Sequence, residues 1–371
     1  MTDVTVAEVP ASRLAVASQW SLIWWAFRRH KLAMVALFVT IALYIVAAVP
    51  GFFAINDPNQ QNARAGYQPP QAIHFFHEGS FVGPYFHPSK LTRDPETLEP
   101  IFVADTTRRV PLVFFGEGYT WSFLGLFASK LHLVATSDAA SPFFPIGTDR
   151  LGRCVWSRIA QGAQISLSLG LVGVFLSLAI GIVLGGISGY YGGKTDFAIQ
   201  RVIEFVLALP TIPIWLAMAA ALPQDWPATT QYLMITIILS LTGWAQLARV
   251  VRGRFLSLRT EEFVSAARLD GCSEGRIIFR HMLPSFASHI IASITLAIPA
   301  MILAETALSF LGLGLQPPTI SWGVLLREAQ NIRSIATAPW LFAPGAAVVV
   351  AVMALNLLGD GLRDAADPYN K

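Results

Sequence analysis

Long apolar stretches alternate with short polar ones along this chain of 371 residues. Charged side chains are absent from seven stretches: 32–56, 159–193, 205–224, 226–248, 281–304, 306–326 and 334–359. A helix needs about 20 mostly apolar residues to cross the hydrocarbon of a bilayer. The stretch 306–326 is broken by Gly312, Gly314, Pro317 and Pro318, so we interpret it as a helix end followed by a loop. The other six stretches predict six membrane-spanning helices.

The predicted spans are 32–53, the C-terminal part of 159–190, 199–222, 229–248, 285–311 and 340–359. Pro210 and Pro213 predict a kink in the third span, because proline removes a helical hydrogen bond. The composition agrees, since 54% of the residues are hydrophobic and 13% are charged, whereas soluble domains carry about 25% charged residues. These features predict an all-α polytopic membrane protein.

The positive charges predict the orientation of the chain. Arg28, Arg29 and Lys31 precede the first span, and seven arginines lie between residues 249 and 280. Loops rich in lysine and arginine face the cytoplasm. Both termini and the loop 249–283 are therefore predicted to be cytoplasmic, in a bacterial inner membrane, with the first span as a retained helix. Cys154 and Cys272 then lie on opposite sides, where they cannot pair.

The segment 1–31 is expected to be cytoplasmic and to contain a helix. Residues 14–29 place apolar side chains at helical spacing and end in Arg28 and Arg29. Tryptophan and arginine together are typical of a helix that lies on the membrane surface. The alternative is a helix that continues directly into the first span.

Residues 54–157 form an insert of different composition, with prolines, charges of both signs and four of the seven histidines. The orientation places it outside the cytoplasm, where we expect a cap with some β structure. Val110–Phe115 and Tyr119–Phe123 flank Gly116-Glu117-Gly118, which predicts a β-hairpin with a glycine turn. His74 and His77 have a possible metal-ligand spacing. No cysteine or acidic cluster accompanies them, so we interpret them as loop histidines.

The segment 261–284 is polar and helical in pattern. Glu262 through Leu269 can form one helix, Gly271 can adopt the left-handed conformation that stops it, and Ser273 can cap a second helix, 274–280. Ala266 and Ala267 offer a flat face that another protein can approach. Connections between helices usually have 2–8 residues, so a loop of about 35 residues favours a partner-docking element over an ordinary loop.

Two carboxylates fall within or at the edges of predicted spans. Charged groups in hydrocarbon are costly and often face a cavity or a partner. For Glu204 we favour an interfacial position, because Arg201 lies one helical turn away. For Glu305 a place on a solute path and a contact with a neighbouring helix are equally compatible with the sequence.

Four motifs in the same order resemble the ABC-importer permeases of the dipeptide, oligopeptide and nickel family. Ala266-Ala267, Gly271 and His281-Met282-Leu283-Pro284 match the EAA loop of these permeases in spacing. The other three motifs are Gly147-Thr148-Asp149-Arg150-Leu151-Gly152-Arg153 with Ile165-Ser166-Leu167, Leu308–Gly314 with Ser321-Trp322-Gly323, and Asn356–Asp364 with Asp367-Pro368. Ser265 departs from the family, which has glutamate there, and most of 54–143 lies outside the resemblance.

The resemblance implies a fold of six transmembrane helices of the type I importer kind, with a permease core over 158–371. It implies a second permease subunit, two ATPase subunits, an extracytoplasmic solute-binding protein and a lipid bilayer as partners. The residues expected to couple the chain to an ATPase are Ala266, Ala267, Asp270, Gly271, Ser273, Arg276, His281, Leu283 and Pro284.

This chain has no glycine-rich loop with Gly-Lys-Ser/Thr. We therefore expect it to be no enzyme and to hold no cofactor or metal, with ATP and magnesium on the partner ATPases. Nothing in the sequence predicts nucleic-acid binding. Peptides are the first expectation for the solute, ahead of opines, oligosaccharides and nickel chelates.

An ion-coupled secondary transporter is the alternative function. It needs buried acidic groups in broken helices, for which Glu204 and Glu305 are the candidates. A membrane-embedded enzyme and a purely structural subunit are further alternatives, and co-purification with an ATPase distinguishes them from a permease.

Overall fold

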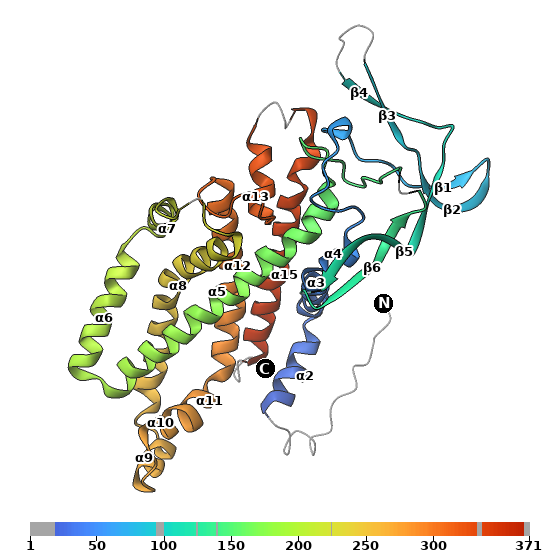
Figure 1. Ribbon diagram of the computed structural model, residues 1–371. Coiled ribbons are helices and arrows are strands. Elements are labelled where there is room, and N and C mark those ends of the chain that lie inside the picture. The colour runs from blue at the N-terminus through green and yellow to red at the C-terminus, as the bar shows by residue number, and fades with distance from the viewer. Residues whose placement is uncertain are drawn as a thin grey trace.

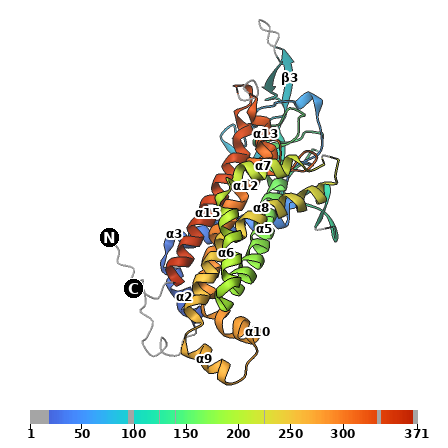
Figure 2. The same cartoon turned by 90° about the vertical axis from the view of Figure 1, so that its left-hand side faces the viewer.

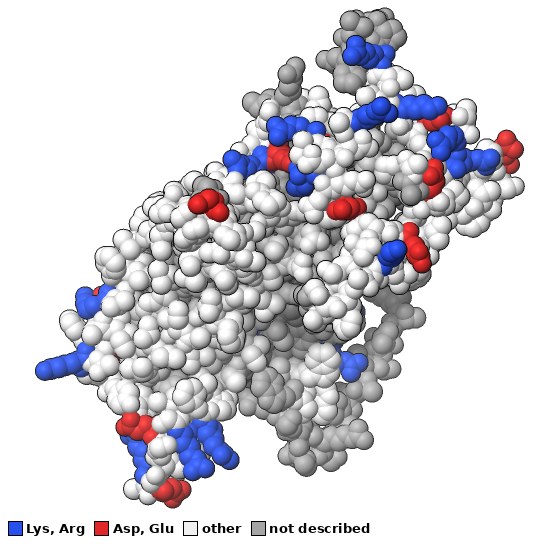
Figure 3. Space-filling view, viewed as in Figure 1, with Lys and Arg blue, Asp and Glu red and all other residues white. Residues whose placement is uncertain are grey.

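The computed structural model describes residues 19–93, 100–123, 125–138, 140–223, 225–331 and 336–366. It consists of a helical bundle with a β-rich insert at one end and a short helical protrusion at the other (Figure 1). Charged side chains gather at these two ends, and the surface between them is almost uncharged (Figure 3). This distribution is the one that a membrane-embedded bundle requires, because charges in hydrocarbon are costly.

Within the described residues, five helical segments are long and apolar enough to cross a membrane: Lys31–Ala48, Val155–Tyr191, Ala228–Leu258, Ile290–Phe310 and Pro339–Ala365. A sixth span results if the bent pair α6 (Gly193–Ala208) and α7 (Thr211–Ala220) is counted as one. The two helices of that pair meet at 85°. The predicted kink is therefore confirmed, and it is a complete break in which Leu209 is extended before Pro210.

The described residues of the N-terminal part form three helices. They are α2 (Gln19–Arg29), α3 (Lys31–Ala48) and α4 (Pro50–Phe53). His30 separates α2 from α3, because its backbone is extended. The alternative of a helix that continues directly into the first span is therefore wrong. Phe27 of α2 packs with the start of α3 against Leu358 near the end of the last helix. Residues 14–18 of the predicted N-terminal helix lie outside the described residues.

The core of the bundle is built around α5 (Val155–Tyr191) and α8 (Ala228–Leu258). Glycines allow their backbones to approach closely: a Cβ atom at Gly185 would lie 2.4 Å from the carbonyl oxygen of Ala248. Small residues are the usual means of close helix packing in membranes. α8 continues ten residues beyond the predicted end at 248, because nothing in its arginine-rich end breaks a helix. The predicted loop 249–283 therefore begins only after Leu258.

The second half of the bundle consists of α12 (Ala287–Phe310), α13 (Trp322–Arg327), η3 (Glu328–Gln330), η4 (Pro339–Phe342) and α15 (Ala343–Ala366). α12 packs against α15 and α5, and α13 contacts all three of these helices. The described start of α2 and the described end of α15 lie at the same end of the bundle (Figure 1). Asp367 and Pro368, which belong to one predicted motif, lie outside the described residues.

The described part of the insert holds a 3-10 turn, η1 (Ala63–Ala65), and six strands: β1 (His74–His77), β2 (Ser80–Phe86), β3 (Ser89–Arg93), β4 (Pro100–Ala104), β5 (Val110–Phe123) and β6 (Phe127–Thr136). One antiparallel sheet has the order β1-β2-β5-β6, and β3 and β4 form a separate pair. The insert ends at Cys154, where α5 begins.

The predicted hairpin turn at Gly116–Gly118 is wrong. β5 runs through these residues, and Glu117 pairs with Leu131 of β6. The turn lies beyond Phe123, where Gly125 has a φ of +75°. The glycines at 116 and 118 serve cross-strand packing instead, since a Cβ atom at Gly118 would lie 2.6 Å from the His132 ring. Only the pairing partner, and not the local sequence, reveals this role.

Candidate functional site: a helical protrusion and two polar clusters

The segment after α8 forms a protrusion at the end of the bundle opposite the insert (Figure 2). It contains α9 (Glu262–Leu269), α10 (Glu274–Arg276), η2 (Ile277–Met282) and α11 (Leu283–Ser285). α9 has the predicted bounds. The second predicted helix is different, because only its first turn is α-helical and η2 is a π-helix. The wider π turn places Ile277 and Met282, five residues apart, on one buried face.

A Schellman motif ends α9. The amide of Cys272 donates to the Ala267 carbonyl at 3.1 Å, and the amide of Gly271 donates to the Arg268 carbonyl at 3.0 Å. Gly271 has a φ of +73°, which a residue with a Cβ atom adopts only at a cost. Ser273 occupies the N-cap position of α10, but its side chain makes no capping hydrogen bond. The turn between the helices is therefore fixed by the backbone of Gly271 and not by Ser273.

The protrusion is anchored to the bundle by an apolar cluster. Val264, Ala267, Ile277 and Met282 are buried, together with Phe286 at the start of α12, and pack against Tyr190, Val251 and Phe255. Polar contacts support this anchor at the end of α5. Tyr191 donates a hydrogen bond of 2.7 Å to Glu274, and the Arg268 guanidinium lies 5.3 Å from the centre of the Tyr190 ring. The protrusion is thus packed directly against α5 and α8.

The predicted coupling residues divide into three sets by their exposure. Those with exposed side chains or backbone are Ala266, Asp270, Gly271, Ser273, Arg276 and Pro284, whereas His281 and Leu283 are half-buried. Ala267 faces inward and is 6% exposed. The predicted flat face of two alanines is therefore wrong for Ala267, because α9 turns that position toward Val251 and Phe255.

Two apolar side chains on the outer surface of the protrusion were not predicted. Leu269 is 89% exposed and Phe279 is 62% exposed. The described part of the chain therefore leaves most of both side chains uncovered. The signal in the sequence was weak, since exposure depends on which side of each short helix faces the bundle.

Glu305 lies at the centre of a buried hydroxyl cluster in the bundle. Its carboxylate accepts hydrogen bonds from Ser166 of α5 at 3.2 Å, Ser309 of α12 at 2.8 Å and Ser321 at 2.7 Å. Each serine oxygen in turn accepts a backbone amide, from Trp322, Leu315 and Val324 respectively. The side chain is completely buried. The arrangement holds α5, α12 and the segment before α13 together, and a role on the solute path stays a prediction.

Glu204 has a different environment. It is exposed on α6 and forms an ion pair of 2.9 Å with Arg201, three residues earlier. Exposed pairs of this kind contribute about 0–1 kcal/mol. The contact with Arg201 is the one that the spacing suggested, and the interfacial position of Glu204 stays a prediction.

A second polar cluster joins the segment before α5 to η3. Arg153 donates to Asp149 at 2.6 Å and to Glu328 at 2.9 Å. Asp149 also accepts the backbone amides of Leu151 and Arg153. Burial raises the pKa of the Glu328 carboxyl. These contacts explain the charged residues of the motif 147–153, which the sequence identified by resemblance only.

Comparison with known proteins places the chain among permeases. The family model described as binding-protein-dependent transport system inner membrane component matches residues 181–370, and a model of the N-terminal TM domain of oligopeptide transport permease C matches residues 18–70. The chain is 36% identical over 223 residues to the oligopeptide transport system permease protein OppC of Bacillus subtilis, covering 60% of this chain and 70% of that protein.

Two further similarities complete the comparison. The dipeptide transport system permease protein DppC of Bacillus subtilis is 38% identical over 224 residues, which is 60% of this chain and 68% of that protein. Among solved structures, inward facing conformations of the MetNI methionine ABC transporter match with a TM-score of 0.43 and 17% identity, covering 56% of this chain and 96% of that chain.

Proposed function

This chain belongs to the family of binding-protein-dependent transport system inner membrane components, and from that membership we propose that it is one permease subunit of an ATP-driven peptide importer. The solute class rests on relatives that are named oligopeptide and dipeptide permeases. The proposed complex contains a second permease subunit, two ATPase subunits and an extracytoplasmic binding protein. ATP hydrolysis takes place on the ATPase subunits.

The observation that carries the proposal is the construction of the protrusion. Its inner face is fixed to α5 and α8 through Val264, Ile277 and Met282, while Leu269 and Phe279 on its outer face are exposed. We propose that this outer face, defined by Leu269, Phe279 and the exposed backbone around Gly271, docks onto an ATPase subunit. Because both faces belong to one stiff unit, closure of the ATPases moves α5 and α8.

The energy requirement supports a stiff connection. Shifting a two-state equilibrium from 1:99 to 99:1 takes about 5.5 kcal/mol of differential interaction. A flexible loop absorbs such a difference by bending. The Schellman motif at Gly271 and the buried anchor prevent this, which supports a coupling role for the protrusion.

The proposed orientation places both termini and the protrusion in the cytoplasm and the insert outside. A cysteine-labelling experiment tests it in cells that carry a Cys272→Ser background. A membrane-impermeant maleimide should label Thr92→Cys in intact cells, whereas Ser265→Cys should react only after permeabilisation. The reverse pattern contradicts the orientation.

The docking proposal is tested by Leu269→Asp and Phe279→Asp in the complete complex. A carboxylate at either position is expected to abolish co-purification of the ATPase subunits and binding-protein-stimulated ATP hydrolysis. Leu91→Asp is the matched control, because Leu91 is 48% exposed and lies on β3 of the insert. Retention of the ATPases and full activity in both variants refutes the docking surface. Uptake that depends on an ion gradient, and not on the ATPases, refutes the proposed function.

A further inference from the structure

The hairpin formed by β5 and β6 is held firmly on the outer end of the first span. His132 of β6 is completely buried, and its ring nitrogens lie 2.7 Å from the Ala54 carbonyl oxygen and 2.9 Å from the Tyr119 carbonyl oxygen. The Trp121 ring lies flat against Gly51 of α4, where a Cβ atom would be 2.4 Å from the ring. The hairpin is therefore fixed in position beside α4.

This position extends the hairpin beyond α4 toward α5 (Figure 1). A cavity of about 660 Å³ lies between the end of the hairpin and the bundle. Its hairpin wall runs from Tyr119 to Ser122 with Gly125, and its bundle wall includes Gln161, Gln164, Ile165, Ala228 and residues 318–320. The insert thus forms one side of this cavity and the helical bundle forms the other, and we call it the entrance cavity.

The chemistry of this entrance cavity is specific. Asp57 is the only charged residue among those that line it. One oxygen of its carboxylate accepts the amide of Asn59 at 2.9 Å, which leaves the other oxygen available. The cavity therefore favours a cationic group over an anionic one.

The opposite wall offers hydrogen bonds of both kinds. Gln161 donates to the Gln164 side-chain oxygen at 3.0 Å, which leaves an acceptor on Gln161 and donors on Gln164. The hydroxyl of Thr319 is buried and has no hydrogen-bond partner among the described residues. A peptide unit presents one N–H donor and one C=O acceptor, which is the complement of this pair of glutamines.

We propose that the entrance cavity receives the N-terminal end of the transported peptide. Asp57 binds the α-ammonium group, and Gln161 with Gln164 binds the first peptide unit. The inference rests on the proposed import of peptides, and it assigns to the insert a direct role in receiving the solute.

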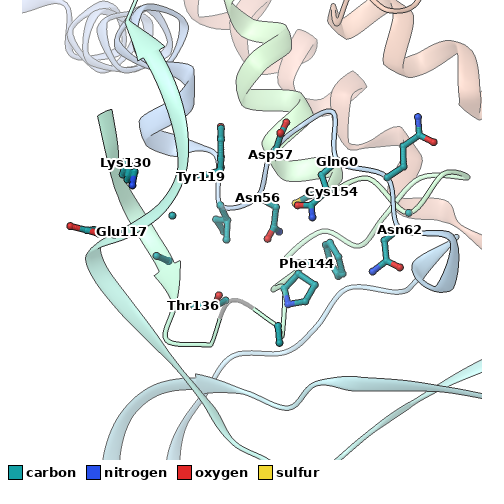
Figure 4. Close-up of a pocket in the computed structure, with 17 residues that line it drawn as sticks. Asn56, Asp57, Gln60, Asn62, Glu117, Tyr119, Lys130, Thr136, Phe144 and Cys154 are labelled. Atoms are coloured by element: carbon teal, nitrogen blue, oxygen red, sulfur yellow. The ribbon is translucent and has the colours of Figure 1, made fainter. Parts of the chain in front are cut away.

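A neighbouring cavity supplies the matched control. It has about 680 Å³ and is lined by Glu117 and Lys130 in addition to Asp57 and Tyr119. Figure 4 shows Asp57 and Tyr119 side by side, directed to one side, whereas Glu117 points away from them. Glu117 does not line the entrance cavity. Glu117→Gln therefore removes a carboxylate from the same hairpin without changing the entrance.

The test uses the complete complex in proteoliposomes with its binding protein, and it measures trialanine taken up per ATP hydrolysed. Asp57→Asn keeps the oxygen that accepts the Asn59 amide but loses the charge. It is expected to lower uptake per ATP about tenfold, the effect of losing one charge-assisted hydrogen bond, with stimulated ATP hydrolysis retained. Asp57→Glu should restore part of the uptake, and Glu117→Gln should behave like the unmodified chain.

A second measurement reports occupancy directly. Ser122→Cys is exposed to a membrane-impermeant maleimide, because Ser122 lines the cavity but has no proposed contact with the peptide. Trialanine delivered by the binding protein should slow its labelling severalfold. Native Cys154 is buried and Cys272 belongs to the protrusion. Normal uptake per ATP in Asp57→Asn, or unchanged labelling of Ser122→Cys, overturns the entrance site while the import function stands. Absence of trialanine uptake in the unmodified complex overturns both.

Discussion

Ser321 donates a hydrogen bond of 2.7 Å to the Glu305 carboxylate, which lies on α12 and is completely buried. This hydrogen bond matters for both the Glu305 carboxyl group and the Ser321 hydroxyl group. The carboxyl group loses its hydration in the bundle, and hydrogen bonds from serine hydroxyls replace it. The serine also caps α13 by accepting the amide of Val324, so the Glu305–Ser321 contact connects α12 to the start of the next helix.

Glu305→Gln is expected to destabilise the permease. The amide oxygen can still accept from Ser309 and Ser321, but the amide NH2 cannot accept the hydrogen bond that the carboxylate takes from Ser166. A buried donor left without its acceptor costs about 1–3 kcal/mol. Thermal unfolding of the complex in detergent measures it. Glu204→Gln is the control, because its exposed ion pair contributes about 0–1 kcal/mol. Equal melting temperatures for the two variants contradict the prediction. Uptake by Glu305→Gln at normal expression tests the path role.

Gly271→Val is expected to uncouple or disassemble the complex. The φ of +73° at Gly271 costs a residue with a Cβ atom roughly 1–2 kcal/mol, and the β-branched side chain adds to this. Solute-stimulated ATP hydrolysis in the reconstituted complex is the measurement. Gly275→Ala serves as the control, since Gly275 lies in α10 and a Cβ atom there meets nothing within 4 Å. Normal stimulation in Gly271→Val refutes the coupling role of this turn.

Gly118→Ala is expected to loosen the β5–β6 hairpin. The added methyl group would lie 2.6 Å from the His132 ring, so the ring must move and lose a hydrogen bond to Ala54 or Tyr119 at a cost of about 1–3 kcal/mol. Faster proteolysis of the insert in the folded complex reports the change. Thr120→Ala on the same strand should digest at the original rate, and equal rates for the two variants would show that the ring accommodates the methyl group.

The insert is expected to lose stability in strong acid through Asp105. A hydrogen bond from Lys90, 2.6 Å away, and another from Thr107 lower the pKa of the Asp105 carboxyl from 3.8 to about 2. A depressed folded-state pKa contributes stability above the unfolded pKa, and this stability is lost as the pH falls from 3.8 through 2. Pepsin cleavage of the β3–β4 region should increase over that window. Asp105→Asn lacks the titrating carboxyl group, so pepsin should already cleave it readily near pH 3.8. An Asp105→Asn variant that keeps the original pH profile contradicts the assignment.

Local sequence determined the spans and part of the protrusion. A charge-free stretch of membrane length crosses hydrocarbon as a helix, because each of its backbone N–H and C=O groups must form a hydrogen bond within the segment. The bounds of α9 and the left-handed turn at Gly271 were likewise predicted, since a capped helix with a glycine stop depends on neighbours within one or two turns. The break at Pro210 follows from the missing amide and the restricted residue before it.

Tertiary structure alone decided the features that depend on distant partners. The strand register of β5 follows from the fit of Gly118 against His132, and the π-helical turn of η2 follows from the buried face that Ile277 and Met282 share. Glu305 acquires its hydroxyl cluster from serines on α5 and before α13. The entrance cavity exists because His132 and Trp121 fix the hairpin on α4. A sequence pattern encodes which segments are apolar, but packing between distant segments selects the side chains that meet.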